Sequence, residues 1–399
     1  MRKKIIFVFA ILTIFLLNLN LFAAFTDTYE HINLYEDTLS KGLGNATTSI
    51  DWLGTGSFLA NPASSVGSKF SMELVLINLS LNQTSLQFGG EISRILSSGS
   101  QNDLFGLIID QIGNPFNLGV KLNLLNFNIP IKDYIGLNFG ILSSVKFFLE
   151  FHNPLSSAGL GDLLGFIGII PYVGISYSLK RVAEEIPLDY IKEYLRNINL
   201  GLNFKFAILK GVNRKITLGD LAAGKVEEIF KEELGSITNS LVSIIPDIGI
   251  LYKIPLYQDK EDNIKIGLSI KDIGGFKIGS EKYPTRFNLG ASYNFTLPNT
   301  GNFLKKNSVS MEIQDLFFQL KDKDFFKRLH IGVISEILNL SDALTLNLAL
   351  GINQGYPTFG TQLKLAVFKF AYSVSAEELG VYAGQDPDIR HNFSLSIGW

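Results

Sequence analysis

The chain has 399 residues, a formal net charge of −2 and no cysteine. The near-neutral charge offers no basic field for nucleic acid, so nucleic-acid binding is not expected. The lack of cysteine excludes disulfides, thiolate metal sites and cysteine nucleophiles. Charged residues make up only 18% of the chain, and the mean hydropathy is +0.23. This composition is more apolar than that of a typical soluble domain.

The first residues have the layout of a secretory signal peptide. A basic start at Arg2, Lys3 and Lys4 is followed by an apolar run from Ile5 to Leu17 and by the small pair Ala23-Ala24. The run is shorter than the roughly 20 apolar residues of a membrane-spanning helix. We therefore predict a signal peptide at 1–24 and export, with an uncleaved membrane anchor as the alternative.

Alternation of apolar and polar residues dominates the rest of the chain. Between 197 and 209, Ile198, Leu200, Leu202, Phe204, Phe206 and Ile208 share one face, and Asn197, Asn199, Gly201, Asn203 and Lys205 share the other. The same period of two recurs at 287–295 and 344–353. Several runs reach the roughly 9–11 residues with which a strand crosses a bilayer. The pattern predicts an all-β, transmembrane antiparallel barrel, and a soluble β-sandwich with shorter strands is the alternative.

We expect fourteen strands, an even number as in bacterial single-chain barrels. The expected strands are 70–80, 117–127, 134–150, 166–180, 197–210, 246–257, 263–273, 284–296, 307–319, 327–338, 343–353, 358–366, 368–375 and 390–399. With the first strand rising from the periplasm, the two longest connections, 81–116 and 211–245, both fall outside. The connection at 181–196 is long for an inner turn.

The two longest outer connections carry apolar residues at helical spacing. We predict helical extracellular loops with Leu104 and Ile108 in one and Phe230 and Leu234 in the other. These residues either pack on the barrel rim or form an apolar landing site for a hydrophobic ligand.

The end of the chain alternates cleanly and stops on an aromatic residue. Phe393, Leu395, Ile397 and Trp399 share one face of the expected last strand. A lipid-facing strand with an aromatic residue at the interface suits barrel closure in outer-membrane lipid. The pattern also resembles the C-terminal signal that the bacterial barrel-assembly machinery reads, which makes that machinery an expected partner.

The segment before the first strand is rich in glycine and turn residues and does not read as a strand. It contains Gly42-Leu43-Gly44, then Gly54-Thr55-Gly56, then Asn61-Pro62-Ala63. A fourteen-stranded barrel is wider than the filled eight-stranded case, so its lumen has room for a plug. We predict a plug at 25–69 and a barrel at 70–399, with Pro62 setting a turn in the plug.

Asn61-Pro62-Ala63 directly before the first strand resembles the hatch of the FadL-type long-chain fatty acid channels. It resembles still more that of the PorV-like and TraF-like outer-membrane proteins. Further similar stretches begin at Pro246, Pro284, Gly351 and Glu378. The resemblance implies a fourteen-stranded barrel with a plugged lumen. The fatty-acid branch implies passive uptake of hydrophobic molecules, and the PorV-like branch implies a partner in protein secretion.

No catalytic or metal-binding pattern is found in the sequence. His31, His152, His330 and His391 show no metal-ligand spacing. His391 and Ser394 are three residues apart on one strand and so face opposite sides. We therefore expect no enzyme activity, no metal and no cofactor.

The leading functional hypothesis is passive uptake of a fatty-acid-like molecule across the outer membrane. Alternation places Asn199, Asn203, Lys205 and Lys253 toward the lumen, where they could orient a polar head. A plugged PorV-like scaffold and a general porin are the alternatives. The sequence leaves the oligomeric state open.

Overall fold

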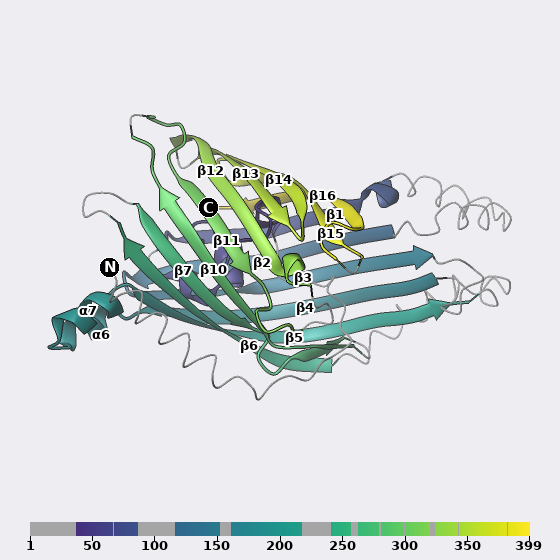
Figure 1. Cartoon of the computed structure of the whole chain (residues 1–399), viewed down its shortest axis with the longest axis horizontal. Helices are drawn as coiled ribbons and strands as arrows, with labels where there is room; N and C mark the ends of the chain where they lie inside the picture. Colours follow the sequence, from purple (N-terminus) through teal and green to yellow (C-terminus); the bar gives the residue numbers. More distant parts are fainter. Residues whose placement is uncertain are drawn as a thin grey trace.

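The computed structural model describes residues 37–66, 68–86, 116–151, 161–217, 241–256, 262–278, 281–298, 300–319, 324–341, 343–380 and 382–399. Fourteen strands within these ranges form one closed antiparallel barrel (Figure 1). They are β1 (Ser71–Asn82), β2 (Phe116–Lys132), β3 (Ile135–Phe151), β4 (Gly161–Ser178), β5 (Ile198–Ile216), β6 (Leu241–Pro255), β7 (Asn263–Lys271), β10 (Arg286–Phe295), β11 (Asn307–Ile313), β12 (Leu329–Ser341), β13 (Leu344–Asn353), β14 (Tyr356–Leu365), β15 (Phe368–Glu378) and β16 (Pro387–Gly398). The ring closes where β1 pairs with β16, with Leu79 opposite Phe393.

The predicted antiparallel barrel of fourteen strands is confirmed, and each expected run overlaps one observed strand. Strands β2, β3, β4 and β5 have 17, 17, 18 and 19 residues. Strand β3 matches its expected range closely, and β2 continues past its expected end at 127 to Lys132. Strands β4 and β5 extend into the expected outer loops, to Gly161 and Ile216. The charged end of β5 stays in the sheet because β4 pairs with it as far as Gly161 opposite Ile216. At the other extreme, β11 has only 7 residues.

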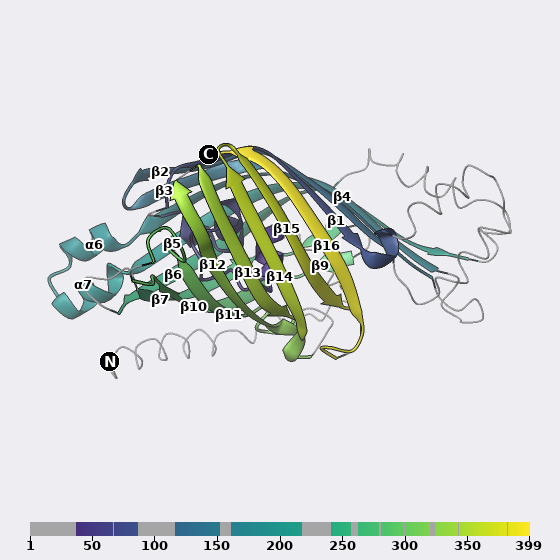
Figure 2. The same cartoon turned by 90° about the horizontal axis from the view of Figure 1, so that it is seen from above.

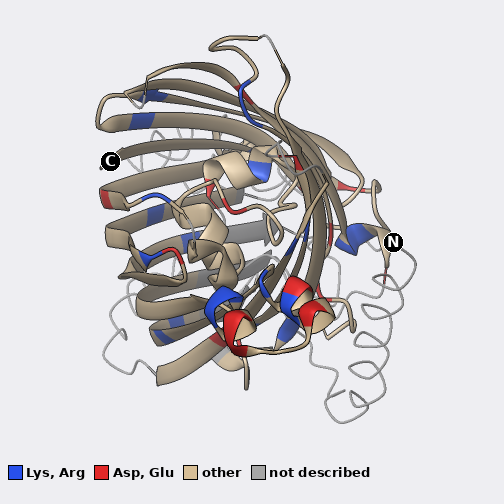
Figure 3. Ribbon diagram, turned by 90° about the vertical axis from the view of Figure 1, so that its left-hand side faces the viewer, with Lys and Arg blue, Asp and Glu red and all other residues tan. Residues whose placement is uncertain are grey.

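The long inner connection at 181–196 contains no further strand. It forms α6 (Lys180–Glu185) and α7 (Asp189–Leu195), which pack on each other and carry acidic and basic residues side by side (Figure 3). Strands β4 and β5 on either side pair directly, with Tyr177 opposite Leu200. None of the helices that the structure describes is long and apolar enough to cross a membrane.

Two connections between neighbouring strands differ in form. Between β14 and β15, Ala366 adopts a φ of 53°, so the chain turns within two residues. Between β7 and β10, the outer connection forms a separate two-stranded sheet of β8 (Phe276–Ile278) and β9 (Glu281–Tyr283).

The two faces of the barrel wall differ in chemistry. Along β7, buried Asn263, Lys265, Gly267 and Ser269 alternate with less buried Ile264, Ile266, Leu268 and Ile270. Exposed apolar side chains cover the outer face of other strands, among them Val173, Ile175, Phe204, Phe206, Ile208, Leu350 and Ile352. Such a closed wall satisfies its backbone hydrogen bonds internally and presents hydrocarbon to lipid, as a transmembrane barrel requires.

A charge on the outer face of β13 tests this orientation. Leu348→Arg at the middle of the strand should destabilise the protein in lipid by about 2–4 kcal/mol, because a charge at the bilayer midplane is poorly solvated. Leu344→Arg, on the same face at the strand's end, should cost at most about 1 kcal/mol. Denaturant unfolding in lipid vesicles measures both, and equal costs would contradict a lipid-facing outer surface.

Candidate functional site

Residues 37–66, here called the lumen segment, lie inside the ring of strands (Figure 2). The segment forms α2 (Thr38–Gly42), α3 (Thr55–Ala60) and the 3-10 helix η1 (Pro62–Ser65). Asp37 begins α2 by accepting a hydrogen bond from the Ser40 amide at 2.7 Å. Burial raises the pKa of the Asp37 carboxyl, although the Ser40 hydrogen bond opposes the rise. The segment falls within the expected plug, whereas residues 1–36, with the expected signal peptide, lie outside the described residues.

Inward-facing glycines let the lumen segment lie directly against the wall. They form a belt on seven strands: Gly201, Gly249, Gly267, Gly290, Gly332, Gly351 and Gly360. Three pairs face each other across neighbouring strands: Gly201–Gly249, Gly267–Gly290 and Gly332–Gly351. A Cβ on Gly351 would lie 2.6 Å from the Gly44 nitrogen, and one on Gly267 would overlap the Thr48 carbonyl. At every belt position except Gly290 a Cβ would lie closer than 3.0 Å to the segment, so these glycines permit a contact that a larger residue would disturb.

Asn61 joins three parts of the structure. Its side chain is fully buried and begins η1 by accepting a hydrogen bond from the Ala63 amide at 3.1 Å. Its amide donates to the Thr48 carbonyl at 2.9 Å and to the Ile250 carbonyl of β6 at 3.1 Å. Pro62 occupies the first position of η1, where its fixed φ suits a helix start. Asn61-Pro62-Ala63 is thus a capped turn fastened to the wall.

Glu312 of β11 holds the loop after α2. Its carboxylate accepts hydrogen bonds from the Thr47 amide at 2.7 Å, the Thr48 amide at 2.8 Å and the Thr48 hydroxyl at 2.8 Å. Other hydrogen bonds from the wall reach the segment at Thr38, Gly42, Gly44, Asn45, Ser49, Phe58, Leu59 and Ser65. Because a buried backbone group needs a partner, these bonds define where the segment is seated.

The four polar residues predicted to face the lumen share the inward parity of their strands, but their surroundings differ. Asn203 is buried and donates to the Phe58 carbonyl at 3.3 Å. Lys205 is buried, and its Nζ lies 2.6 Å from both Asp247 and Asp272. Asn199 is half-buried and Lys253 is exposed. Lys205 therefore balances buried carboxylates, and the role of all four in binding a polar head stays a prediction.

The sequence analysis missed the partners of Lys205. Asp247 lies on the inward face of β6, and Asp272 follows β7 with a φ of 57°. Arg286 at the start of β10 also pairs with Asp272 at 2.8 Å. Alternation around Pro246 could have placed Asp247 inside. No local pattern marks Asp272, because its position depends on three strands distant in sequence.

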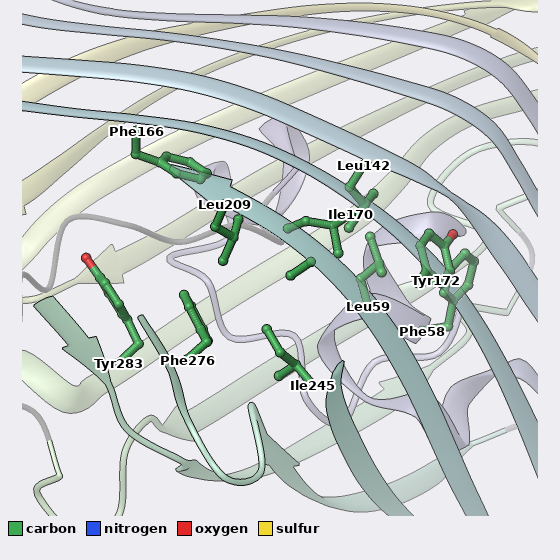
Figure 4. Packing of buried hydrophobic residues seen from close by; sticks show 11 residues of the cluster. Phe58, Leu59, Leu142, Phe166, Ile170, Tyr172, Leu209, Ile245, Phe276 and Tyr283 are labelled. Atoms are coloured by element: carbon green, nitrogen blue, oxygen red, sulfur yellow. The ribbon is translucent and has the colours of Figure 1, made fainter. Parts of the chain in front are cut away.

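One sector of the lumen is lined by large apolar side chains. This apolar lumen patch comprises Leu142, Phe166, Ile170, Tyr172, Ala207, Leu209 and Ile245 from β3 to β6, Phe58 and Leu59 from the lumen segment, and Phe276 and Tyr283 from β8 and β9 (Figure 4). Inward positions elsewhere are mostly polar, for example Asn78, Asn128, Ser292 and Asn392. The patch thus separates an apolar sector from a polar one.

A small polar pocket adjoins this patch. It is lined by Ser40, Asn45, Thr47, Thr48, Gly56, Ala60, Lys271, Arg286, Asn288, Glu312 and Gln314. Leu59 of the patch directly precedes Ala60 of the pocket, and Lys271 donates to the Leu59 carbonyl. An apolar surface therefore meets two cationic side chains at one point beside the lumen segment. Among the described residues, no cluster of metal-ligating side chains is found.

The remaining predicted residues lie on the last strand or outside the described parts of the chain. Leu104, Ile108, Phe230 and Leu234 of the expected landing site are outside the described residues. Phe393, Leu395 and Trp399 are exposed on the outer face, and Ile397 is half-buried. The strand that closes the ring, β16, carries Phe393, Leu395 and Ile397, and Trp399 directly follows it.

The fold and interior define a closed β-barrel whose lumen is occupied by its own N-terminal segment. No family model and no curated protein matches the sequence. Among solved structures, the chain is similar to the P. putida toluene transporter TodX, with 10% identity, a TM-score of 0.45 and coverage of 92% of this chain and 99% of that chain.

A TodX deltaS2S3 mutant, described as a monoaromatic hydrocarbon channel, gives 9% identity and a TM-score of 0.48 over 91% of this chain and 98% of that chain. An outer membrane channel from Pseudomonas putida F1 gives 10% identity and a TM-score of 0.35 over 84% and 96%. At these identities the similarity concerns the fold alone.

Removing the buried cation tests the role of Lys205. Lys205→Met should destabilise the protein by about 3–5 kcal/mol, because two carboxylates would lose their buried partner. Lys253→Met, an exposed position on the neighbouring strand, is the matched control and should change stability little. Denaturant midpoints measure both, and a small effect at Lys205 would restore it as a candidate for binding a polar head.

The glycine belt makes a separate prediction. Gly267→Ala should loosen the lumen segment, since overpacking of a filled interior costs about 1–3 kcal/mol. Gly119→Ala is the matched control, because a Cβ there would meet the Ser80 Cβ at an ordinary 3.4 Å. Limited proteolysis of the segment in the folded barrel should accelerate only for Gly267→Ala. Equal rates would mean that the wall does not constrain the segment.

Proposed function

We propose that this protein is an outer-membrane channel for the passive passage of hydrophobic, fatty-acid-like small molecules. The observation that carries the proposal is the apolar lumen patch on one sector of an otherwise polar interior. Water-filled porins have polar lumens, whereas a site for an apolar solute is lined mainly by apolar and aromatic side chains. An apolar outer face on a closed barrel supports the placement in a membrane.

The neighbouring polar pocket extends the proposal to amphipathic solutes. Lys271 and Arg286 line the pocket where it meets the patch at Leu59 and Ala60. A solute with an apolar tail and an anionic head would place its tail on the patch and its head near these cations. Export through the signal peptide at 1–24 and capture on Phe230, Leu234, Leu104 and Ile108 belong to the same proposal.

A second candidate function is a sealed scaffold that binds partners in protein secretion. The observation that favours it is the dense attachment of the lumen segment. Asn61, the Glu312 carboxylate and the Thr358 hydroxyl tie the segment to β6, β11 and β14. A scaffold needs no path through the barrel, so a permanently seated segment suits it. A general porin remains the third hypothesis.

Liposome reconstitution separates the three functions. The refolded mature protein should give saturable uptake of a fluorescent long-chain fatty acid with little ion conductance. Conductance without ligand would instead indicate a porin. Neither uptake nor conductance would indicate a sealed scaffold and would contradict the channel.

The landing site is tested in the same assay. Phe230→Asp combined with Leu234→Asp should abolish uptake while barrel insertion persists, because charge weakens adsorption of an apolar solute. Lys225→Asp, about 140° around the expected helix from Phe230, is the control. Unchanged uptake in the double variant would remove the landing site from the proposal and leave the channel intact.

A further inference from the structure

The β8–β9 hairpin is an outer connection that folds into the lumen. It follows β7 and precedes β10, and both strands meet it at their outer ends. Strand β8 contacts β5 and β6 on the inside of the wall. The rings of Phe276 and Tyr283 stack with centroids 4.9 Å apart and an interplanar angle of 7°. Both side chains are buried, at 5% and 4% exposure, which is unusual for a loop.

The stacked rings cover the wall residues of the apolar lumen patch. Figure 4 shows Phe276 and Tyr283 beside Leu209 and Ile245 of the wall. Ile245 has no exposed surface. Outer solvent therefore does not reach this apolar surface while the hairpin occupies its observed position.

The base of the hairpin is fixed by polar contacts. Asp272 pairs with Lys205 and Arg286, and its amide donates to Asp247 at 2.7 Å. The Thr285 hydroxyl donates to the Asp272 carbonyl at 3.2 Å, so the two ends of the connection are held together. These contacts keep β7 and β10 in place whatever the hairpin does beyond them.

A glycine pair stands between this fixed base and the rings. Gly274 and Gly275 have φ values of 87° and 69°, in the left-handed region that favours glycine. Gly274 is exposed, and a Cβ on it would meet no atom within 4 Å. Gly275 lies against the Tyr283 carbonyl, and the Gly274 amide donates to the Thr285 hydroxyl at 3.0 Å. Opening would break these contacts, with Gly274 as the open position at which the chain can rotate.

We propose that the β8–β9 hairpin is the outer gate of the channel, with the Phe276–Tyr283 pair seated where an apolar solute binds. The inference rests on the proposed function and identifies the hairpin as the element that moves when a solute enters. Apolar packing seats the rings, and an apolar solute can replace such packing. The lumen segment is held by hydrogen bonds such as those of Asn61 and Glu312, which an apolar solute cannot replace.

Because the chain has no native cysteine, an introduced cysteine pair can be crosslinked without side reactions at other thiols. Phe276→Cys combined with Ile245→Cys would let a reducible bis(methanethiosulfonate) crosslinker join the hairpin to β6, and reduction would free it. The probe is N-phenyl-1-naphthylamine, a neutral aromatic dye, entering proteoliposomes. Crosslinking should lower the uptake rate by about tenfold and reduction should restore it, as expected when a lid controls access. Thr38→Cys with Asn78→Cys locks the lumen segment instead and should leave uptake unchanged; in the structure their hydrogen-bonding atoms are 2.5 Å apart.

A second variant opens the gate without a crosslink. Phe276→Ala with Tyr283→Ala should raise dye uptake and speed maleimide labelling of an added Ile245→Cys. Phe317→Ala is the control, because Phe317 packs edge-on against Phe287 in the next outer connection. Heat-modifiable gel migration shows that each variant has folded.

The outcomes separate the gate from the channel. If neither crosslinking nor ring removal changes the rate of dye uptake, the gate is overturned and the channel is not. Slow labelling at position 245 after ring removal would also overturn it. No uptake by the unaltered protein would overturn the proposed function, and the gate with it.

Discussion

The rest of the structure depends on the close contact between the backbone of the lumen segment and the barrel wall. A polypeptide inside a barrel brings many amide and carbonyl groups, and each needs a partner. The glycine belt removes the side chains that would hold the segment away. The Glu312 carboxylate therefore reaches the backbone of the segment, and the Asn61 side chain of the segment reaches the Ile250 carbonyl of the wall. Because these glycines lie on seven of the fourteen strands, the segment contacts half of the ring through them.

This seating divides the interior into two parts with different chemistry. Around α2 and the following loop, the wall supplies hydrogen-bonding groups such as Glu312, His330 and Thr358. Beside α3 and η1, β3 to β6 supply large apolar residues such as Phe166 and Ile245. The polar part fixes the segment by hydrogen bonds. The apolar part is covered by the rings of Phe276 and Tyr283, whose packing does not depend on hydrogen-bond geometry. The hydrogen bonds that fix the segment and the apolar packing that a solute could replace therefore lie in separate sectors of the lumen.

The sequence was enough to predict the barrel because its signal is local and repeated. Each strand alternates two chemistries, as 197–209 does, and one alternation suffices to orient a whole strand. The alternation was therefore enough to predict that Asn203 and Lys205 lie on the inward face of β5. The outer ends of β4 and β5 were not predictable in the same way, because a charged stretch such as Lys210–Ile216 stays extended through its pairing with β4.

The interior contacts were largely beyond local reasoning. Asn61 was singled out by its position before β1. Its bonds to Thr48 and to Ile250 of β6, however, join it to residues 13 and 189 positions away in the chain. Gly201 and Gly267 could be assigned to the inward face, but what touches them is set by the folded segment. The β8–β9 hairpin has too few residues for periodicity, and its inward position depends on packing of Phe276 and Tyr283 against strands distant in sequence.

The unequal strand lengths give the wall an uneven height. The 17 residues of β2 span about 56 Å along the strand, or about 43 Å across the membrane at a common tilt. The 7 residues of β11 span about 23 Å along the strand, less than the roughly 30 Å of hydrocarbon in a bilayer. Lipid beside the short side must thin locally while the tall side rises through the headgroups. The barrel is therefore expected to tilt in its membrane and to deform the surrounding leaflets unequally, which gives it a preferred orientation toward neighbouring membrane proteins.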